Sequence, residues 1–271
     1  MNTTELPAID GHVKIDATKV NEFKKNGHTL IKNVLSKDEV TAYREVINTA
    51  AYKYNTEKRS LKERDTYGKA FLQIMNLWEA DKEVRKFTLA KRFAKIAAGL
   101  LGVNNVRIYH DQALYKEPGG GFTPWHQDQY YWPLDTNNTI TMWMPLIHIT
   151  EEMGMLTFAS GSHKSGFIEN VAISDESEKK LEQHIKDKGF FISRPPSMNA
   201  GDATWHYGWT LHSAPGNTSK DTREVMTIIY FADGAHVIEP QNEHQENDRQ
   251  RWLEGLPPGS LAASPLNPLV L

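Results

Sequence analysis

Eight short runs rich in β-branched and aromatic residues restrict the fold of this chain more than any other feature. Gly, Pro and Asn residues separate the runs, as is typical of strands joined by turns. This pattern predicts two packed antiparallel sheets or a jelly roll and disfavours a parallel α/β fold. We therefore expect a mainly β protein with peripheral α-helices and a jelly-roll, cupin-like core. The predicted strands are Val106–Lys116, Thr123–Trp132, Thr139–Ile149, Met155–Ala159, Phe190–Arg194, Ala203–Tyr207, Thr210–Ser213 and Glu224–Phe231.

The residues before the first of these strands have the pattern of amphipathic helices. Ser36 and Glu39 form a capping box ahead of apolar residues spaced three and four apart. The segment Phe71–Trp78 is apolar and is interpreted as a buried connection. The predicted helices extend from Asp16 or Thr18 to Gly27, from Ser36 to Tyr54, and from Glu79 to Leu101 with Gly102 as the stop.

One further helix is predicted to interrupt the strands. Asp175 with Glu178 caps the segment Glu176–Lys188, in which only Leu181 and Ile185 form an apolar stripe. A helix with so little apolar surface is expected to be largely solvated. We predict that this helix and its flanks are mobile without substrate and become ordered over the functional site when substrate binds.

The chain has 271 residues, a length that all-β proteins reach as one domain. We expect a single domain over residues 1–271. Its parts are a helical N-terminal third (1–102), a jelly-roll core (103–235) and a non-regular C-terminal wrap (236–271). The wrap is expected because the final residues are rich in Pro and Gly.

The composition bears on partners and location. A net charge of −3 gives no single-signed field for nucleic acid or an anionic membrane. No stretch approaches the ~20 apolar residues of a membrane span, and the first residues lack a signal-peptide pattern. We therefore expect a small-molecule substrate, no nucleic-acid or membrane partner and a cytoplasmic location, while the oligomeric state is not indicated. Because the chain has no cysteine, a metal site must use His, Asp or Glu.

A candidate metal site lies in the sequence Trp125-His126-Gln127-Asp128-Gln129. Side chains two positions apart lie on the same face of an extended strand, so His126 and Asp128 can bind one ion together. A second histidine from elsewhere would complete a facial triad that suits non-haem Fe(II). An isolated pair of this kind is usually a surface pair or a satisfied hydrogen bond, so the remaining residues must decide.

The third ligand is expected from a later strand. Of the eleven histidines, the choice narrows to His206 and His212 in the segment Gly201–Asn217. Arg223 distinguishes His212 from His206 as the candidate ligand, because it follows His212 by eleven residues and begins an apolar strand. An arginine that enters an apolar strand needs an anionic partner.

The chain combines several sequence features: His126-x-Asp128, Trp143, the Gly161-Ser162-His163 loop, Gly201-Asp202, His212 and Arg223. In this combination the chain resembles the phytanoyl-CoA dioxygenase family of Fe(II)/2-oxoglutarate oxygenases. The likeness extends from the Phe23-x-x-x-Gly27 opening to the Pro-rich tail. The combined spacing is far more specific than a His-x-Asp pair alone.

The resemblance implies a double-stranded β-helix core and a set of ligands. His126, Asp128 and His212 would bind Fe(II), which leaves three coordination positions for 2-oxoglutarate and O₂. Arg223 would bind the distal carboxylate of 2-oxoglutarate. The retained carboxylate at Asp128 favours hydroxylation or another oxidation over halogenation, because iron halogenases of related fold have a small residue there.

The resemblance also implies weaker assignments around the cosubstrate. Trp143 matches a family tryptophan beside 2-oxoglutarate. Gln73 and Gln112 fall where relatives place polar or sulfur side chains against it. The aromatic groups Tyr130–Trp132 and Trp205–Trp209 can be core residues or can line a cleft for an apolar or ring-bearing substrate. Such a substrate would be hydroxylated with succinate and CO₂ as co-products, and no basic patch indicates a CoA ester.

Two alternatives stay open at the level of sequence. A jelly-roll isomerase, lyase or hydrolase could use the same three ligands with Zn²⁺ or Mn²⁺ and without 2-oxoglutarate, but it would not require Arg223. A binding protein of this fold could have lost activity, in which case the intact ligand set would be a coincidence.

Overall fold

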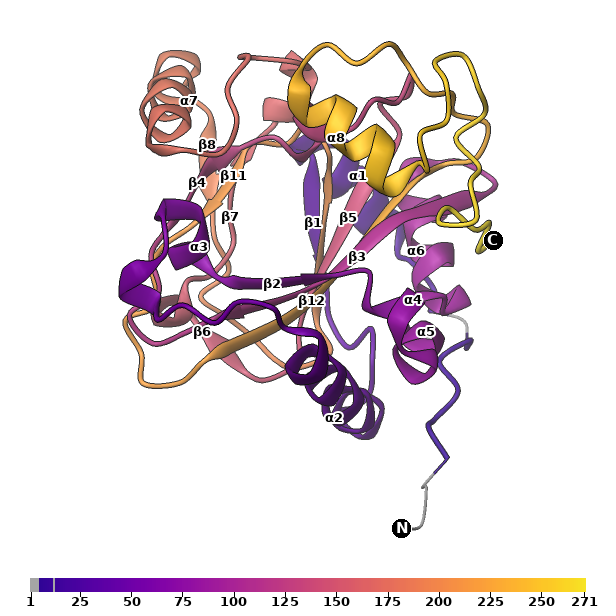
Figure 1. Cartoon of the computed structure of the whole chain (residues 1–271), viewed down its shortest axis with the longest axis vertical. Helices are drawn as coiled ribbons and strands as arrows, with labels where there is room; N and C mark the ends of the chain where they lie inside the picture. The colour runs from indigo at the N-terminus through magenta and orange to yellow at the C-terminus, as the bar shows by residue number, and fades with distance from the viewer. Residues whose placement is uncertain (1–4, 12) are drawn as a thin grey trace.

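The computed structural model describes residues 5–11 and 13–271, and all strand pairs within this part of the chain are antiparallel. A six-stranded sheet and a four-stranded sheet form the core shown in Figure 1. The larger sheet has the order β1 (His28–Ile31), β10 (Ala203–Tyr207), β5 (Thr139–Pro145), β12 (Arg223–Ala232), β3 (Val106–Lys116) and β2 (Leu72–Met75). The smaller sheet has the order β4 (Thr123–His126), β11 (His212–Ala214), β7 (Thr157–Ser160) and β8 (Phe191–Ser193). A short pair consists of β6 (Ile149–Thr150) and β9 (Ser197–Met198).

The two faces of the larger sheet have different neighbours because side chains alternate along a strand. In β5, Ile140 and Met142 belong to the main hydrophobic core together with residues of the N-terminal helices. The intervening Thr141 and Trp143 line a cavity on the opposite face. One face of the larger sheet therefore packs in the hydrophobic core, and the other face lines the cavity.

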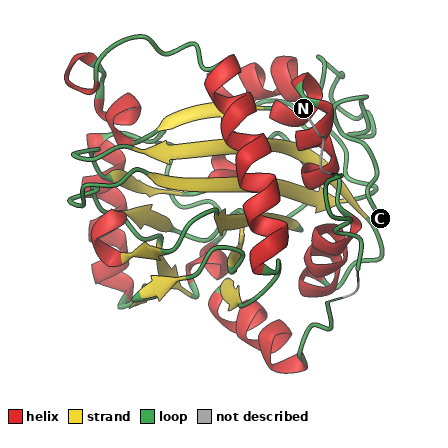
Figure 2. Ribbon diagram, turned by 90° about the horizontal axis from the view of Figure 1, so that it is seen from below, coloured by secondary structure: helices red, strands yellow, loops and turns green. Residues whose placement is uncertain are grey.

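The N-terminal helices supply the cover for the core face. Figure 2 shows helices lying across the strands. Their apolar residues and those of the sheet form one continuous buried cluster, as expected for layers that bury one face each. The helices are α1 (Ala17–Asn26), α2 (Lys37–Tyr54), α3 (Thr66–Ala70), α4 (Leu77–Ala80), α5 (Lys82–Thr88), α6 (Lys91–Leu101), α7 (Asp175–Lys188) and α8 (Glu243–Trp252), with short 3₁₀ turns η1 (Leu61–Glu63), η2 (Asp128–Tyr131), η3 (Glu151–Met153) and η4 (Ser162–Ser165).

The prediction of a mainly β protein with a jelly-roll core and peripheral helices is confirmed. The predicted starts of the first two helices are also confirmed. The Asp16 side chain accepts a hydrogen bond from the Thr18 amide, and Gly27 ends α1 with a φ of 83°. Ser36 and Glu39 form both halves of a capping box at the start of α2.

The single helix predicted from Glu79 to Leu101 is wrong, because α4, α5 and α6 occupy this region as separate helices. Asp81 causes the first break: its carboxylate accepts hydrogen bonds from the amides of Glu83 and Val84 and so begins a new helix. Gly102 does end α6 in the left-handed conformation, as predicted.

The interpretation of Phe71–Trp78 as a connection is also wrong. Residues Leu72–Met75 form β2, which pairs with β3 at the edge of the larger sheet. Strand β1 was not predicted either. The N-terminal third therefore contributes strands to both edges of the larger sheet as well as the helices that cover it.

Several predicted strands end early or divide. The strand predicted over Thr123–Trp132 stops at His126 and is followed by η2. The strand predicted over Thr139–Ile149 divides into β5 and β6, because β5 ends at Pro145, which lacks the amide hydrogen needed to continue the ladder.

Two helical predictions need correction in the second half of the chain. Ser174, not Asp175, caps α7, and its partner in the capping box is Ser177. The C-terminal wrap (236–271) is not wholly irregular, because Glu243–Trp252 forms α8. No helix in the described part of the chain is long and apolar enough to cross a membrane.

Candidate active site

A cavity of about 400 Å³ lies on the inner face of the larger sheet and is bounded on the other side by the smaller sheet. Helix α8, in yellow in Figure 1, contributes to its wall. The cavity contains all seven site residues predicted from the sequence. They are Gln73, Gln112, His126, Asp128, Trp143, His212 and Arg223.

Strand pairing brings the three candidate metal ligands together. β11 pairs with β4 so that His212 lies directly opposite His126, and Asp128 begins the 3₁₀ turn after β4. The Nε2 atoms of His126 and His212 lie 3.5 and 3.4 Å from Oδ1 of Asp128. One ligand atom from each residue lies within 4.8 Å of the others, which is a spacing that one ion can bridge.

The main chain fixes the orientation of both imidazoles. Nδ1 of His126 lies 2.7 Å from the carbonyl oxygen of Pro124, and Nδ1 of His212 lies 2.9 Å from that of Thr210. A carbonyl oxygen can only accept, so each Nδ1 carries the hydrogen and each Nε2 presents its lone pair to the cluster. These residues fit a divalent metal ion because two imidazole lone pairs and a carboxylate oxygen converge on one point.

His206 has a different place at the same carboxylate. Its Nε2 lies 3.3 Å from Oδ2 of Asp128, and the Thr141 hydroxyl donates to that oxygen at 2.9 Å. Both contacts are made to Oδ2, whereas Oδ1 is the oxygen beside His126 and His212. His206 is therefore outside the three-residue cluster and helps to orient Asp128.

The ionisation of the cluster follows from its mutual contacts. Burial acts to raise the pKa of Asp128, but a positive charge on His212 and the hydrogen bonds that the three histidines donate when their Nε2 atoms are protonated hold that pKa well below its usual range. Burial and the neighbouring His212 lower the pKa of His126. Burial opposes protonation of His212 as well, but the adjacent Asp128 raises its pKa. The cluster therefore presents an ionised carboxylate, as a cation requires.

Arg223 is the first residue of β12 and is only 2% exposed. It donates to the carbonyl oxygen of Gly154, and its guanidinium carbon lies 5.2 Å from the centre of the Trp143 ring. No carboxylate of the described residues lies within 4.0 Å of it, and its Nε has no hydrogen-bond partner. Burial lowers its pKa to about 9. A buried arginine without an anion is costly, so the cavity is suited to an anionic ligand.

Gln73 and Gln112 lie together in the same cavity. Nε2 of Gln73 donates to Oε1 of Gln112 at 2.5 Å, and the Tyr67 hydroxyl donates to Oε1 of Gln73 at 3.1 Å. Both glutamines line the cavity. Their contact with a cosubstrate stays a prediction.

The aromatic residues expected either in the core or at a substrate cleft divide between the two. Tyr131 and Trp132 line the cavity, whereas Trp205 is fully buried beneath the N-terminal helices. The Trp209 ring nitrogen donates to Asn137 at 2.8 Å, away from the cavity.

The outer wall of the cavity was missed in the sequence because α8 was not predicted. This wall includes His244, Asp248, Arg251 and Trp252. The Tyr109 hydroxyl donates a hydrogen bond of 3.0 Å to Oδ2 of Asp248, and burial raises the pKa of Asp248 to about 7. The Asn242 cap was the available signal, since its side chain accepts from the Gln245 amide at the start of α8.

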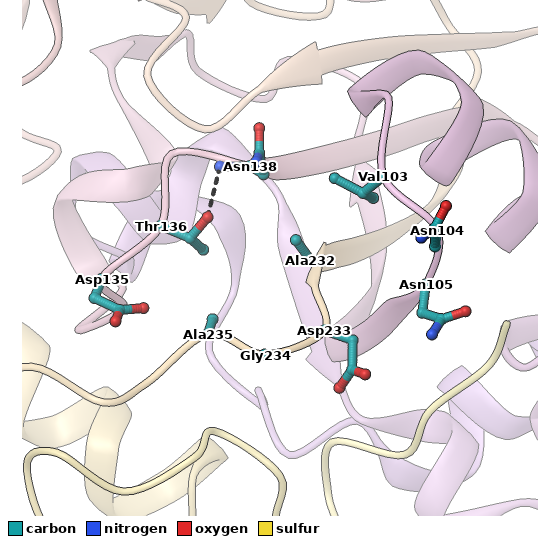
Figure 3. Close-up of a pocket in the computed structure, with 10 residues that line it drawn as sticks. All are labelled: Val103, Asn104, Asn105, Asp135, Thr136, Asn138, Ala232, Asp233, Gly234 and Ala235. Atoms are coloured by element: carbon teal, nitrogen blue, oxygen red, sulfur yellow. Dashed lines mark hydrogen bonds between the residues drawn. The ribbon is translucent and has the colours of Figure 1, made fainter.

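A second hollow, shown in Figure 3, lies at the turns beside Asn105, Asp135 and Asp233. Its carboxylates are already paired: Asp233 with Arg107 at 2.5 Å, and Asp135 with His236 at 3.3 Å. This hollow is open and polar, and the metal-type cluster lies elsewhere. The cavity between the sheets is therefore the candidate active site.

The fold and this cavity define the class of jelly-roll oxygenases that use non-haem iron and 2-oxoglutarate. The sequence matches the family described as Phytanoyl-CoA dioxygenase (PhyH) over residues 23–225, and the chain belongs to this family. Peroxisomal phytanoyl-CoA dioxygenase of Homo sapiens is 21% identical over 251 residues, which cover 83% of this chain and 71% of that protein.

Two solved structures share the fold. The non-heme alpha ketoglutarate dependent carbocyclase SnoK from nogalamycin biosynthesis has a TM-score of 0.80 at 24% identity, and the match covers 96% of this chain and 100% of that chain. The epimerase SnoN in complex with Fe3+, alpha ketoglutarate and nogalamycin RO has a TM-score of 0.76 at 20% identity, with 94% of this chain and 98% of that chain covered. The protein is an Fe(II)- and 2-oxoglutarate-dependent dioxygenase that uses O₂.

Proposed function

We propose that His126, Asp128 and His212 bind Fe(II), that Arg223 binds the distal carboxylate of 2-oxoglutarate, and that the enzyme hydroxylates a small ring-bearing molecule. One observation carries the proposal: a single cavity contains both the three-ligand cluster and a buried arginine that has no carboxylate partner among the described residues. An isomerase or lyase that worked with the metal alone would need the cluster but not the arginine.

The protein's contribution to this chemistry is orientation and exclusion of water. When bound, Fe(II) with 2-oxoglutarate and O₂ supplies the oxidising chemistry. His126 and His212 present fixed lone pairs, and His206 with Thr141 holds Asp128 so that one carboxylate oxygen faces the ion. The strands that carry these residues are buried and pair with each other, which keeps the ligands in place before the metal arrives.

We propose that Trp143, Gln73 and Gln112 line the cosubstrate part of the cavity. The Trp143 ring lies against the Arg223 guanidinium and so limits its rotation. The two glutamines are bonded to each other, which leaves Gln112's amide nitrogen to interact with a ligand oxygen. Substitution of either glutamine is expected to affect 2-oxoglutarate less than substitution of Arg223.

The substrate part of the cavity is proposed to be its outer half. Aromatic rings of Tyr67, Tyr131, Trp132 and Trp252 line it, and the carboxyl of Asp248 lies among them. Aromatic walls with a few placed polar groups are typical of sites for small ring-bearing molecules. A volume of about 400 Å³ for the whole cavity also favours a small molecule over a CoA ester.

Anaerobic addition of Fe(II) and 2-oxoglutarate tests the proposed cofactor site. A visible charge-transfer band is expected with the wild-type protein, since 2-oxoglutarate binds to Fe(II) through its keto and carboxylate oxygens. The band should be lost in His212→Ala. If the wild-type protein binds Fe(II) but gives no band with 2-oxoglutarate, the result would favour an isomerase, lyase or hydrolase that uses the metal without 2-oxoglutarate. Succinate release in a screen of ring-bearing compounds then tests the substrate class, and mass gain of one oxygen from labelled O₂ tests hydroxylation.

Two broader expectations from the sequence are kept as proposals. We propose that residues 1–271 act as one domain, because β1 and β2 of the N-terminal third lie in the same sheet as β12. A single cooperative unfolding transition would support this. A cytoplasmic location and the absence of a nucleic-acid partner also stay predictions, and the human relative is described as peroxisomal.

A further inference from the structure

Asp248 is an acidic residue of the cavity to which the proposed function gives no role. It belongs to α8, lines the outer half of the cavity and is only partly exposed. No nitrogen of Lys, Arg or His in the described part of the chain lies within 4.0 Å of its carboxylate. Burial raises the pKa of this carboxyl to about 7, which reflects the cost of removing its charge from water. A carboxylate held in a cavity wall without a cation calls for a physical reason.

The contacts that Asp248 makes favour its ionised form over the neutral acid. The Tyr109 hydroxyl donates to Oδ2 at 3.0 Å, and hydrogen bonding with the Trp252 side chain lowers the pKa of Asp248 against the effect of burial. The indole nitrogen of Trp252 can only donate. Both neighbours are therefore uncharged donors that orient the carboxyl as an acceptor. The partner that Asp248 still lacks is a cation.

A bulge in β3 directs two consecutive side chains toward this end of the cavity. The pairing of β3 with β12 shifts register at Tyr109, which has no opposing residue in β12. Tyr109 contacts Asp248, while the next residue, His110, lines the cavity. Neighbouring side chains of a regular strand would point to opposite faces, and bulges that redirect a side chain are common beside functional sites. The local distortion of β3 thus supports the carboxyl of Asp248.

The other groups at this end of the cavity leave room for a cationic ligand. His110 is 4% exposed, and its Nδ1 has no hydrogen-bond partner in the described part of the chain. Burial lowers the pKa of His110 to about 3, so this imidazole is neutral and does not supply the missing cation. Arg251 acts to lower the pKa of Asp248, but its side chain is exposed and lies over the Trp252 ring, 4.2 Å from the ring centre. Aromatic rings attract cations to their faces, so the aromatic wall around Asp248 favours the same kind of ligand as the carboxylate.

We propose that Asp248 is the counter-ion for a positively charged nitrogen of the substrate, so that the enzyme oxidises a ring-bearing amine. This inference rests on the proposed function, in which the outer half of the cavity holds a small ring-bearing molecule. An ammonium group at the α8 wall pairs with the carboxylate, and the rest of the molecule lies on the side of the metal cluster, which the same cavity contains. A hydroxyl group in the same place would accept or donate a hydrogen bond but would leave the charge of Asp248 unpaired. Asp248 thus selects the substrate by charge.

The test uses two pairs of compounds that share a ring and differ in charge: 2-phenylethylamine with 2-phenylethanol, and tryptamine with tryptophol. Each is titrated by calorimetry at pH 7.5 into the anaerobic complex of the protein with Fe(II) and 2-oxoglutarate. Asp248→Asn removes the charge but keeps an acceptor for Tyr109, and Glu243→Gln is the matched control, because it removes one charge from an exposed residue of α8 outside the cavity. We expect the wild type and the control to bind each amine on the order of ten-fold more tightly than its alcohol, the scale of one hydrogen bond to a charged group. Asp248→Asn should lose this preference and keep its affinity for the alcohols.

Several outcomes would overturn the inference. Equal affinities for amine and alcohol in the wild type, or no detectable binding of either amine, would do so even if Asp248→Asn proved unstable. A preference that survives in Asp248→Asn, or that is lost equally in Glu243→Gln, would show that Asp248 is not the counter-ion.

The charge-transfer band of Fe(II) with 2-oxoglutarate, recorded for each protein, separates this inference from the proposed function. A band in the wild type without an amine preference would overturn the inference alone, whereas absence of the band would overturn the proposed cosubstrate site. A normal band and melting curve in Asp248→Asn would show that this variant folds and that its effect is confined to the substrate.

Discussion

His206 and His212 lie beside the same carboxylate, and their second ring nitrogens distinguish them. Nδ1 of His212 is hydrogen-bonded to the Thr210 carbonyl, whereas Nδ1 of His206 has no hydrogen-bond partner in the described part of the chain. Of the two, only His212 has a ring orientation fixed by the main chain and an Nε2 atom beside Oδ1 of Asp128, the oxygen that also lies near His126. The geometry gives the two histidines different expected roles.

The two histidines should respond differently to substitution. His212→Ala is expected to abolish Fe(II) binding, because one of three ligands is lost. His206→Ala is expected to weaken it by about 10–100-fold, the effect of a group that orients a ligand. Anaerobic Fe(II) titration against a competing chelator measures both, with melting curves as a check on folding. Loss of binding in His206→Ala together with normal binding in His212→Ala would reverse the assignment.

Arg223 should be specific for the cosubstrate. Arg223→Lys is expected to weaken 2-oxoglutarate binding by roughly 1–3 kcal/mol, because a lysine cannot make two parallel hydrogen bonds to a carboxylate. Arg223→Ala should weaken it further, while Fe(II) affinity without 2-oxoglutarate changes little. Titration of both ligands under anaerobic conditions gives the two affinities. A parallel fall in both would indicate an arginine that only supports the fold.

At the level of single residues, the sequence indicated the candidate ligands but not the burial of Lys116. His126, Asp128 and Arg223 could be predicted because close spacing and a charge in an apolar strand are local signals. Lys116 carries no such signal, since a lysine at a strand end usually reaches solvent. Its burial depends on the Gly121 carbonyl and on Arg223, which only the folded sheet brings beside it.

Among the elements, helix α7 is mostly polar but is anchored to β4, the strand that carries His126. Leu181 and Ile185 are buried, and Oε2 of Glu178 accepts a hydrogen bond of 2.8 Å from the Trp125 amide in β4. The helix itself does not line the cavity, but Ala172 and Ile173 just before it do. The segment ahead of the helix is thus better placed than the helix to cover a substrate.

Hydrogen exchange tests the predicted ordering over the site. Amides of residues 166–174 are expected to exchange more slowly when substrate is added to the Fe(II) and 2-oxoglutarate complex, and those of Glu176–Lys188 should follow to a smaller degree. The smaller effect is expected because the helix is already anchored to β4. Exchange that is unaltered in both segments with a turned-over substrate would exclude a lid in this part of the chain.

Strong periodic patterns explain which elements could be predicted. Helix α2 and strand β3 have long, regular apolar patterns and were predicted with nearly the observed bounds. Helix α8 buries only Gln245 and Trp252, so it has no apolar stripe to reveal it. The divisions at Asp81 and Pro145 depend on one side chain each, and these local effects override a longer apolar pattern.

For the molecule as a whole, the buried Lys116 links stability to pH. Its pKa is about 6 in the folded protein against 10.5 for an unperturbed lysine. The unfolded chain therefore binds more protons between these values, and the free energy of unfolding rises with pH by up to about 1.4 kcal/mol per pH unit.

Urea unfolding without 2-oxoglutarate at pH 7.0 and 8.5 measures this dependence. The wild-type protein should gain more stability over this interval than Lys116→Met, which lacks the titrating amine. The interval stays below the pKa of about 9 of Arg223, which acts in the same direction above it. Parallel changes in the two proteins would mean that Lys116 stays charged in the fold.

The carbonyl groups of Pro124 and Thr210 that hold the two metal-facing imidazoles have a consequence for descent within the family. A carbonyl of the main chain is present whatever residue stands at its position, so point mutations elsewhere do not remove these two contacts. Tyr67 and the residues of α8 line the outer cavity and take no part in these two contacts. New substrate preferences can therefore arise by successive single substitutions in the outer wall, each passing through a protein that still holds its iron.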